Sequence, residues 1–302
     1  MLTILLATAL STYQLPPKEI VEAFDAKPLP EAILSPSRKV LAFTQRRAQP
    51  TIAELAQPML RLAGERINPK TFGLQRTRLI YAITLKKISG APLSSAAGRG
   101  GPRPSTEINV TVPPNANMSW VKFSDDGSKL SFINTKGDDT ELWIANVTTG
   151  KAKMAADHLN ATTGDPCDWL HDNATLVCKF VPLGRRLAPS APPVPSGPNV
   201  QENEGKTAQV ATYEDMIKTA HDEELFAYYF TSQLDVVDGV VAGSQPAASR
   251  AKSPRTTPIG KPAIYNEVTP SPNGEYLLVT KIKRPFSHLL PMNGFAEDVE
   301  IL

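Results

Sequence analysis

Apolar and polar positions alternate along this chain in short runs, and four pairs of runs are joined by a turn of small and polar residues. Each pair consists of an apolar strand, a turn built from Ser, Pro, Asp, Gly or Asn, and a second apolar strand. Asp-Gly and Asn-Gly accept the positive φ angles of a tight hairpin turn. The pattern therefore predicts four β-hairpins, over Ala32–Phe43, Val121–Phe132, Asp168–Val177 and Thr269–Val279.

The second hairpin extends into a larger unit. A third apolar run follows at Thr140–Val147, and after the turn at Gly150 a fourth run covers Lys151–Met154. Four short strands joined by tight turns are typical of one blade of a β-propeller, and blades recur at roughly 40–50 residues. The turns at Asp126 and Asp172 have about this spacing. We favour an all-β fold, a partial β-propeller of four-stranded blades; a β-sandwich with similar hairpins is the alternative.

The two other intervals between hairpins are about twice as long, and each is expected to hold a degenerate blade, an insertion or both. Short helices are expected there and before the first hairpin, at Pro17–Ala26, Thr51–Leu62 and Thr212–Tyr228. Flexible insertions rich in Gly, Ser, Ala or Pro are expected at about 90–105, 182–200 and 240–257.

The last repeat reaches a third strand at Asp298–Leu302, without a fourth. This predicts an incomplete propeller domain over residues 13–302. Residues 1–12 include the apolar stretch Leu2–Leu10, which is short for a membrane span and has no basic residues before it, so it is interpreted as a possible leader remnant. The compartment is open, and both an organellar and a secretory leader fit.

The amino-acid composition limits which classes of binding partner are expected. Hydrophobic residues make up 41% of the 302, aromatic residues 7%, and the formal net charge is +2 with the two signs well mixed. No basic patch favours nucleic acid or an anionic membrane as a partner.

Two cysteines, Cys167 and Cys178, flank the third hairpin. With a two-residue turn at Asp172 and Asn173 they would form a hydrogen-bonded pair, which suits disulfide geometry poorly. We therefore expect two buried thiols. Five Asn-x-Ser/Thr sequons could mark glycosylated loops or reflect turn chemistry alone; they begin at Asn109, Asn117, Asn146, Asn160 and Asn173.

Motifs for catalysis or metal binding are missing from the sequence. It contains no H-E-x-x-H, no C-x-x-C and no phosphate-binding glycine loop, and a G-x-S-x-G elbow does not occur. The acidic run at His221–Glu224 would point to different faces of a helix. No cofactor, metal site or catalytic residue is expected.

Several segments, insertions included, resemble one family, the glutamyl endopeptidases of the prolyl-oligopeptidase family of serine peptidases, found in bacteria and chloroplasts. The matching segments are Tyr13–Ile20, Ile52–Ala56, Leu62–Pro69, Val194–Asn199, Tyr213–Tyr229, Thr231–Leu234 and Lys283–Ser287. The resemblance implies a propeller that covers a C-terminal α/β-hydrolase domain carrying the Ser, Asp and His triad. It becomes loose at Gly294–Asp298, and without the serine elbow the triad cannot be assigned to any residue here.

The resemblance leaves two functions open. In the first, the chain is the substrate-gating propeller of a serine peptidase that cuts peptides after Glu once joined to the hydrolase domain. In the second, it is an inactive propeller that binds a peptide or protein. Under the first, Arg284 is a candidate for binding the substrate carboxylate, because a guanidinium pairs with it bidentately; an ordinary surface ion pair is the alternative.

Overall fold

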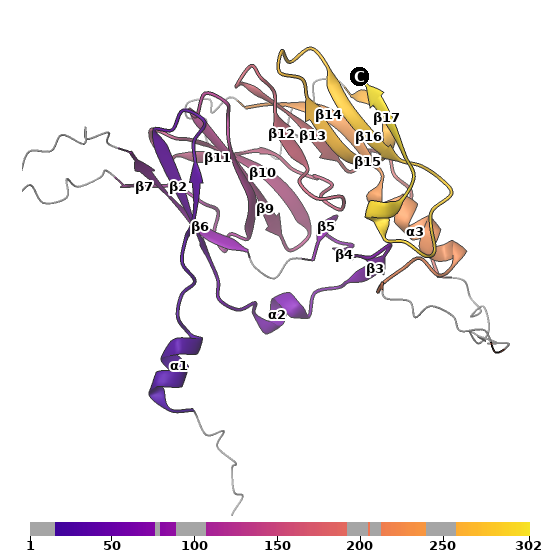
Figure 1. Ribbon diagram of the computed structural model, residues 1–302, viewed down its shortest axis with the longest axis horizontal. Coiled ribbons are helices and arrows are strands. Elements are labelled where there is room, and N and C mark those ends of the chain that lie inside the picture. Colours follow the sequence, from indigo (N-terminus) through magenta and orange to yellow (C-terminus); the bar gives the residue numbers. More distant parts are fainter. Residues whose placement is uncertain (1–15, 76–78, 89–106, 192–204, 206–212, 240–257) are drawn as a thin grey trace, which may run out of the picture.

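A computed structural model (Figure 1) describes residues 16–75, 79–88, 107–191, 205, 213–239 and 258–302 of the protein. These residues are mostly β-structure, with three α-helices and one short 3-10 helix. The helices are α1 (Lys18–Phe24), α2 (Ile52–Leu55), α3 (Ala220–Phe230) and η1 (Met292–Gly294). The strands are β1 (Glu31–Leu34), β2 (Val40–Arg46), β3 (Leu60–Leu62), β4 (Glu65–Asn68), β5 (Gly73–Leu74), β6 (Ile80–Lys87), β7 (Glu107–Asn109), β8 (Met118–Phe123), β9 (Lys129–Lys136), β10 (Asp139–Asn146), β11 (Ala152–Ala156), β12 (Cys167–Trp169), β13 (Thr175–Phe180), β14 (Ser232–Asp238), β15 (Ile259–Pro270), β16 (Leu277–Ile282) and β17 (Glu297–Ile301).

All four predicted hairpins are confirmed. They are the antiparallel pairs β1–β2, β8–β9, β12–β13 and β15–β16. The second hairpin continues through β10 and β11 as the sequence pattern predicts. In its turn Gly127 has φ +71°, a left-handed conformation that residues with a Cβ rarely adopt.

Apart from β3, β4 and β5, the strands fall into four antiparallel groups in chain order (Figure 1). The first is β1-β2-β6-β7 and the second is β8-β9-β10-β11, and only the pair Ile80 and Met118 joins them into one eight-stranded sheet. The third group is β12-β13-β14 with the first part of β15, and the fourth is the rest of β15 with β16 and β17. β15 thus passes from one group to the next without a break.

Successive groups bury apolar faces against each other. One core cluster, which includes Leu85 and Phe123, combines the first two groups. A second cluster, with Ile133 and Trp169, combines the second and third groups, and a third, with Leu234 and Val279, combines the third and fourth. Inner sheets therefore bury both faces, which explains why five consecutive residues of β9, Leu130–Asn134, are all buried although polar and apolar side chains are mixed among them.

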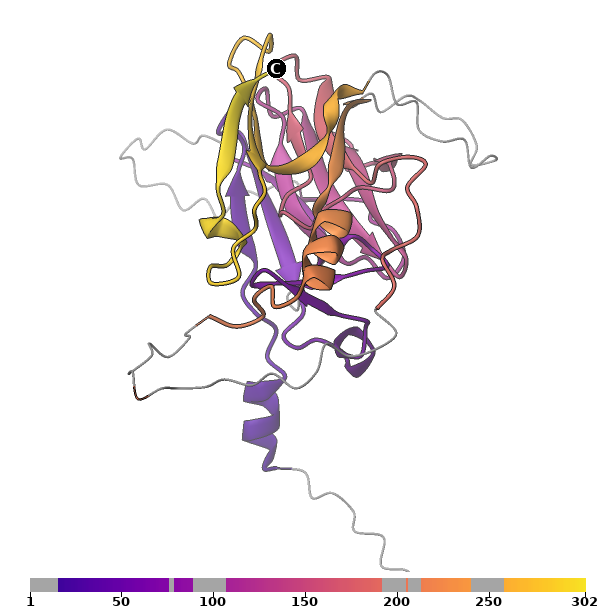
Figure 2. The same cartoon turned by 90° about the vertical axis from the view of Figure 1, so that its right-hand side faces the viewer.

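The long intervals between hairpins contain insertions. The first holds α2 and a separate three-stranded sheet, β3-β4-β5, and the second holds α3. Figure 2 shows α3 beside the small sheet, and both contribute to a fourth core cluster together with residues after β16, including Phe286 and Phe295. In these described parts the other strands of both intervals complete the flanking groups and form no further hairpin unit. The predicted segments at 90–105 and 240–257 lie outside the described residues, as does the part of 182–200 from residue 192 onward.

Two helix predictions were wrong in extent. Thr51 and Glu54 form the predicted capping box, yet α2 ends after one turn because Pro58 cannot continue a helix, and the chain then enters β3. The helix expected from Thr212 begins instead at Ala220, because Thr219 and Asp222 form the capping box. The helix predicted near Pro17 is confirmed as α1. None of the described helices is long and apolar enough to cross a membrane.

Candidate functional site

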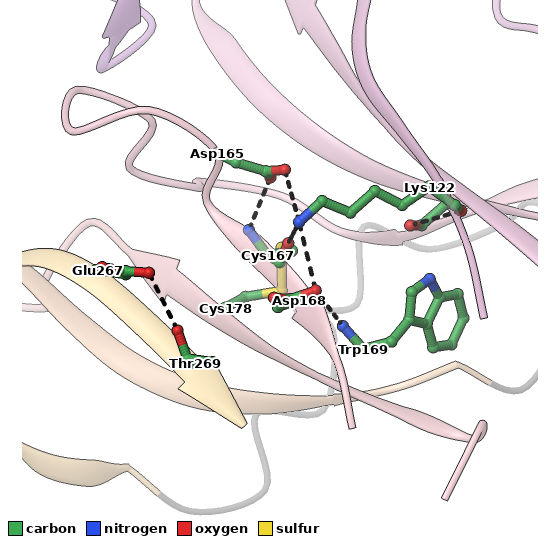
Figure 3. A network of polar contacts seen from close by, with 9 residues as sticks. Lys122, Asp165, Cys167, Asp168, Trp169, Cys178, Glu267 and Thr269 are labelled. Atoms are coloured by element: carbon green, nitrogen blue, oxygen red, sulfur yellow. Dashed lines mark hydrogen bonds and ion pairs between the residues drawn. A yellow bond between two sulfur atoms is a disulfide. The ribbon is translucent and has the colours of Figure 1, made fainter. Parts of the chain in front are cut away.

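A cavity of about 240 Å³ lies where three strand groups meet. Its walls come from β8, from β12 and β13 with the loop before them, and from β15. Figure 3 shows Lys122 reaching Asp165 and Asp168 from a neighbouring strand, with Glu267 and Thr269 apart from them on another strand. The cavity is of interest because lysine and carboxylate side chains rarely become buried unless they are paired.

Lys122 of β8 connects two strand groups across the cavity. Its Nζ lies 2.9 Å from Asp165 Oδ2 and 3.3 Å from Asp168 Oδ1 (Figure 3). Burial acts to lower the pKa of Lys122, but the two carboxylates outweigh it and hold this pKa above its usual value. Burial raises the pKa of Asp165, the more enclosed partner, against the attraction of Lys122. Lys122 is thus fully engaged in holding β12 to β8.

Lys179 of β13 is the most deeply buried charge of the site, with 4% of the residue exposed. Its Nζ donates a hydrogen bond to Thr163 Oγ1 at 2.7 Å, and the Thr163 hydroxyl donates to the Tyr265 carbonyl oxygen at 2.9 Å. An ammonium group has three N–H donors. Within the described chain the other two have no acceptor. Burial lowers the pKa of Lys179 to about 8, against the attraction of Asp165.

The third wall is β15, where Glu267 lies at the exposed rim. Its Oε1 accepts a hydrogen bond from the Thr269 hydroxyl at 3.3 Å (Figure 3). Among the described residues no cation pairs with this carboxylate. The site as a whole therefore offers two ammonium groups and three carboxylates, with unfilled donors at Lys179 and unfilled acceptor capacity at Glu267.

Cys167 and Cys178 form a disulfide beside the cavity, so the expectation of two thiols was wrong. The reason is the length of the turn. Leu170 and Thr175 close the hairpin, with the Leu170 N–H donating to the Thr175 carbonyl oxygen at 2.9 Å, so four residues form the loop instead of two. This shifts the alternation of the ladder by one position and makes the cysteines a non-hydrogen-bonded pair, where side chains approach closely.

The predicted substrate-binding residue Arg284 is not part of this cavity. Its Nη1 lies 3.0 Å from Glu223 Oε2, and its guanidinium stacks 4.6 Å from the ring centroid of Phe286. Glu223 also accepts a hydrogen bond from His288 Nε2 at 2.8 Å, which, with Arg284, lowers the pKa of the Glu223 carboxyl. The acidic run at His221–Glu224 thus serves helix capping and ion pairing, and the substrate role of Arg284 stays a prediction.

Two further features were considered as sites. A cavity of about 440 Å³ borders Arg66, but Asp215 and Glu214 neutralise this guanidinium at 2.7 and 3.1 Å. Asp139, Asp157 and His158 present possible ligand atoms within 4.8 Å of one another. Asp139 Oδ1 already accepts the backbone N–H groups of Thr140 and His158, so we assign no metal to this group.

The sequon at Asn160 has a structural role. Asn160 is 1% exposed, and its Nδ2 donates to the carbonyl oxygens of Tyr229 and Thr231, both at 2.9 Å. A glycan cannot be attached to an amide in this position, so for Asn160 the structural interpretation is the correct one.

The chain has sequence relatives among known proteins, although no protein-family model matches it. It is 36% identical to a probable chloroplastic glutamyl endopeptidase of Oryza sativa subsp. japonica, over 98% of this chain and 30% of that protein. The corresponding protein of Arabidopsis thaliana is 34% identical over 96% of this chain and 29% of its own length. The chain is homologous to the glutamyl endopeptidases. It spans less than a third of the length of these relatives.

Among solved structures, the acylaminoacyl peptidase of Pyrococcus horikoshii superposes with a TM-score of 0.42 at 11% identity, over 93% of this chain and 32% of that one. A structure from a study of two prolyl endopeptidases gives a TM-score of 0.40 at 10% identity, over 88% of this chain and 28% of the other. The sequence relatives, and not these superpositions, establish the homology to glutamyl endopeptidases, as the motif resemblance predicts.

Sequence reasoning did not single out Lys122, Asp165 or Lys179. For Lys179 a signal was present, since a lysine interrupts the apolar run of β13 at a position where core residues surround it. For Lys122 and Asp165 the sequence contained no such signal, because their pairing depends on how two strand groups pack.

Proposed function

We propose that this chain is the propeller portion of a prolyl-oligopeptidase-family serine peptidase that hydrolyses peptide bonds after Glu. The observation that carries the proposal is the 36% identity to a probable glutamyl endopeptidase over 98% of the chain, which includes the insertions as well as the hairpins. The bond-breaking groups belong to an α/β-hydrolase domain outside this chain.

The strand arrangement supports the propeller. Four antiparallel groups follow one another in the sequence, and each packs face to face on the next through its own apolar cluster. Blades of a propeller pack in this way, with the first strand of each blade innermost. The strands β8, β12 and the second part of β15 would then line the central channel, and the charged cavity would open to it.

In this function the chain does no covalent chemistry. It excludes folded proteins by its rigid sheets, admits extended peptides, and holds them near the catalytic domain. Binding energy from a part of the enzyme remote from the reacting bond improves catalysis when it positions the substrate.

The test begins with the native transcript beyond codon 302, followed by expression of the complete reading frame. We expect a continuing frame that encodes G-x-S-x-G, and a product that cleaves a peptide after Glu far faster than its Gln counterpart. A stop codon directly after Leu302, or a complete protein without preference for Glu, would refute the proposal. The first outcome would favour the alternative, an inactive propeller that binds a peptide or protein.

Arg284 as the group that recognises the substrate carboxylate is part of the same proposal. A substrate would have to compete with Glu223 for the guanidinium. In the complete enzyme, Arg284→Ala should reduce the preference for Glu over Gln at least tenfold, whereas Arg46→Ala, which removes a half-buried arginine paired with Glu31, should leave it unchanged. Equal preference in the Arg284 variant and the unmodified enzyme would assign Arg284 to surface ion pairing alone.

A further inference from the structure

The charged cavity has hydrogen-bonding capacity that the described protein does not fill. Two N–H donors of Lys179 lack an acceptor there, although the residue is only 4% exposed. Buried polar groups in folded proteins are nearly always hydrogen-bonded, since an unsatisfied donor loses its interaction with water. The unfilled donors therefore point to an acceptor supplied from outside.

The opposite wall offers the complementary group. Glu267 lies at the rim on β15, and the only hydrogen bond to its carboxylate in the described structure is the one from Thr269 to Oε1. Lys122 does not compete for it, because Asp165 and Asp168 occupy that ammonium group. The cavity thus presents free donors on one side and a free acceptor on the other.

The balance of charge selects the kind of ligand. Three carboxylates and two ammonium groups give the site a formal charge of about −1, which opposes a carboxylate or phosphate. A peptide group is neutral and provides both a carbonyl acceptor and an N–H donor. The volume, about 240 Å³, is below the roughly 300–1,000 Å³ typical of small-molecule sites and suits one or two residues of an extended chain.

The adjacent backbone is already engaged, so the ligand is left to the side chains of the cavity. β12 is the terminal strand of its six-stranded sheet, and among the described strands it pairs with β13. Its outward-facing groups are bonded to side chains of the site: Cys167 N–H donates to Asp165 Oδ1 at 3.2 Å, Trp169 N–H donates to Asp168 Oδ1 at 3.0 Å, and the Cys167 carbonyl oxygen accepts from Lys122 Nζ at 3.4 Å. The disulfide between Cys167 and Cys178 fixes β12 to β13 next to the cavity, so this edge is held in place before a peptide arrives.

We propose that this cavity binds the main chain of an extended peptide, with Lys179 donating hydrogen bonds to a peptide carbonyl oxygen and Glu267 accepting one from a peptide N–H. These contacts involve only the main chain of the peptide, so binding tolerates different side chains. The negative formal charge of the cavity disfavours acidic segments. Its place in a substrate channel rests on the proposed function, but peptide binding by this chain does not require the hydrolase domain.

The experiment is a calorimetric titration of the complete 302-residue chain with an acetylated and amidated hexapeptide of alternating Ala and Ser. A second hexapeptide carries three Glu residues. We expect the neutral peptide to bind, and the acidic one to bind at least threefold more weakly. Lys179→Met should weaken binding of the neutral peptide at least tenfold, as expected for the loss of a hydrogen bond to a charged group. Lys151→Met, at an exposed lysine, is the matched control and should bind like the unmodified chain.

A variant at the rim tests the charge argument without altering a buried residue. Glu267→Gln should strengthen binding of the acidic peptide about threefold, whereas Glu107→Gln, another exposed glutamate, should not change it. Absence of binding by the unmodified chain, or equal binding by the Lys179 variant, would overturn the proposal. The outcomes are separable from the proposed function: Glu-directed cleavage by the complete protein without peptide binding here refutes only the inference, and binding without such cleavage refutes only the peptidase.

Discussion

Replacement of Lys179 by Met should stabilise the fold at neutral pH, and the gain should shrink as the pH rises. Lys179 is 4% exposed, and burial lowers its pKa from 10.5 to about 8. Below pH 8 both the folded and the unfolded chain hold the proton, so the folded state bears the full cost of the buried charge. Between pH 8 and 10.5 the unfolded chain binds more protons than the folded one, and stability therefore rises with pH.

The size of the effect follows from the shift. A difference of 2.5 pKa units between the unfolded and folded chain corresponds to about 3 kcal/mol at pH 7. At pH 9.5 about 1.5 kcal/mol of this cost remains. Met has nearly the same length without the charge, and hydrophobic replacements of buried ions are often neutral or stabilising. The variant should therefore exceed the unmodified chain in unfolding free energy at pH 7, by a margin that falls by about 2 kcal/mol at pH 9.5.

Urea unfolding followed by tryptophan fluorescence at both pH values measures this margin. Lys151→Met provides the control, since an exposed lysine should give no pH-dependent difference. The difference in unfolding free energy between the Lys179 variant and the unmodified chain could instead be the same at both pH values within about 0.5 kcal/mol, roughly the resolution of such data. That result would show that the ammonium group is well solvated in the folded state. The burial argument would then fail, and the peptide-binding inference would lose its unfilled donors.

Three other predictions concern stability. Replacing Cys167 and Cys178 together by Ala should lower the unfolding free energy by about 2–3 kcal/mol, the value for a loop of this size, and a reductant should then have no further effect on urea unfolding. Asn160→Ala should cost about 2–3 kcal/mol in the same assay because two carbonyl oxygens lose their donor; a cost below 0.5 kcal/mol would contradict the assigned role. Phe226→Ala should cost about 3–5 kcal/mol, because this ring is fully buried against three other phenylalanine rings, whereas the exposed Phe24→Ala should change stability by less than about 0.5 kcal/mol; similar effects of the two would refute the packing argument.

The hairpins could be predicted from the sequence because they depend on local chemistry. Alternation defines which residues of a strand face the core, and a turn such as Asp126-Gly127 restricts the backbone by itself. The helix boundaries were less accessible, since several Thr residues could each begin a helix, and only the capping box at Thr219 and Asp222 forms before α3.

Features of the site depend on relations that sequence alone does not contain. The disulfide follows from the register of one hairpin, where two additional loop residues reverse the pairing type of the cysteines. The partners of Lys122 lie in another strand group, so no local pattern indicates them. Lys179 could be recognised in the sequence as a lysine within an apolar run. That two of its donors are unfilled could be recognised only once the position of its partner Thr163 was known.

The core formed by the insertions has a consequence for synthesis of the protein. Ala63, made early, accepts a backbone hydrogen bond from Met292, made near the end of the described chain, and Leu62 and Ile67 share one apolar cluster with Phe286 and Phe295. At about 5–20 residues per second, a ribosome needs on the order of ten to forty seconds to make the intervening chain. During that time the apolar residues of β3 and β4 have no permanent cover, so this small sheet is where we expect a nascent chain to recruit a chaperone.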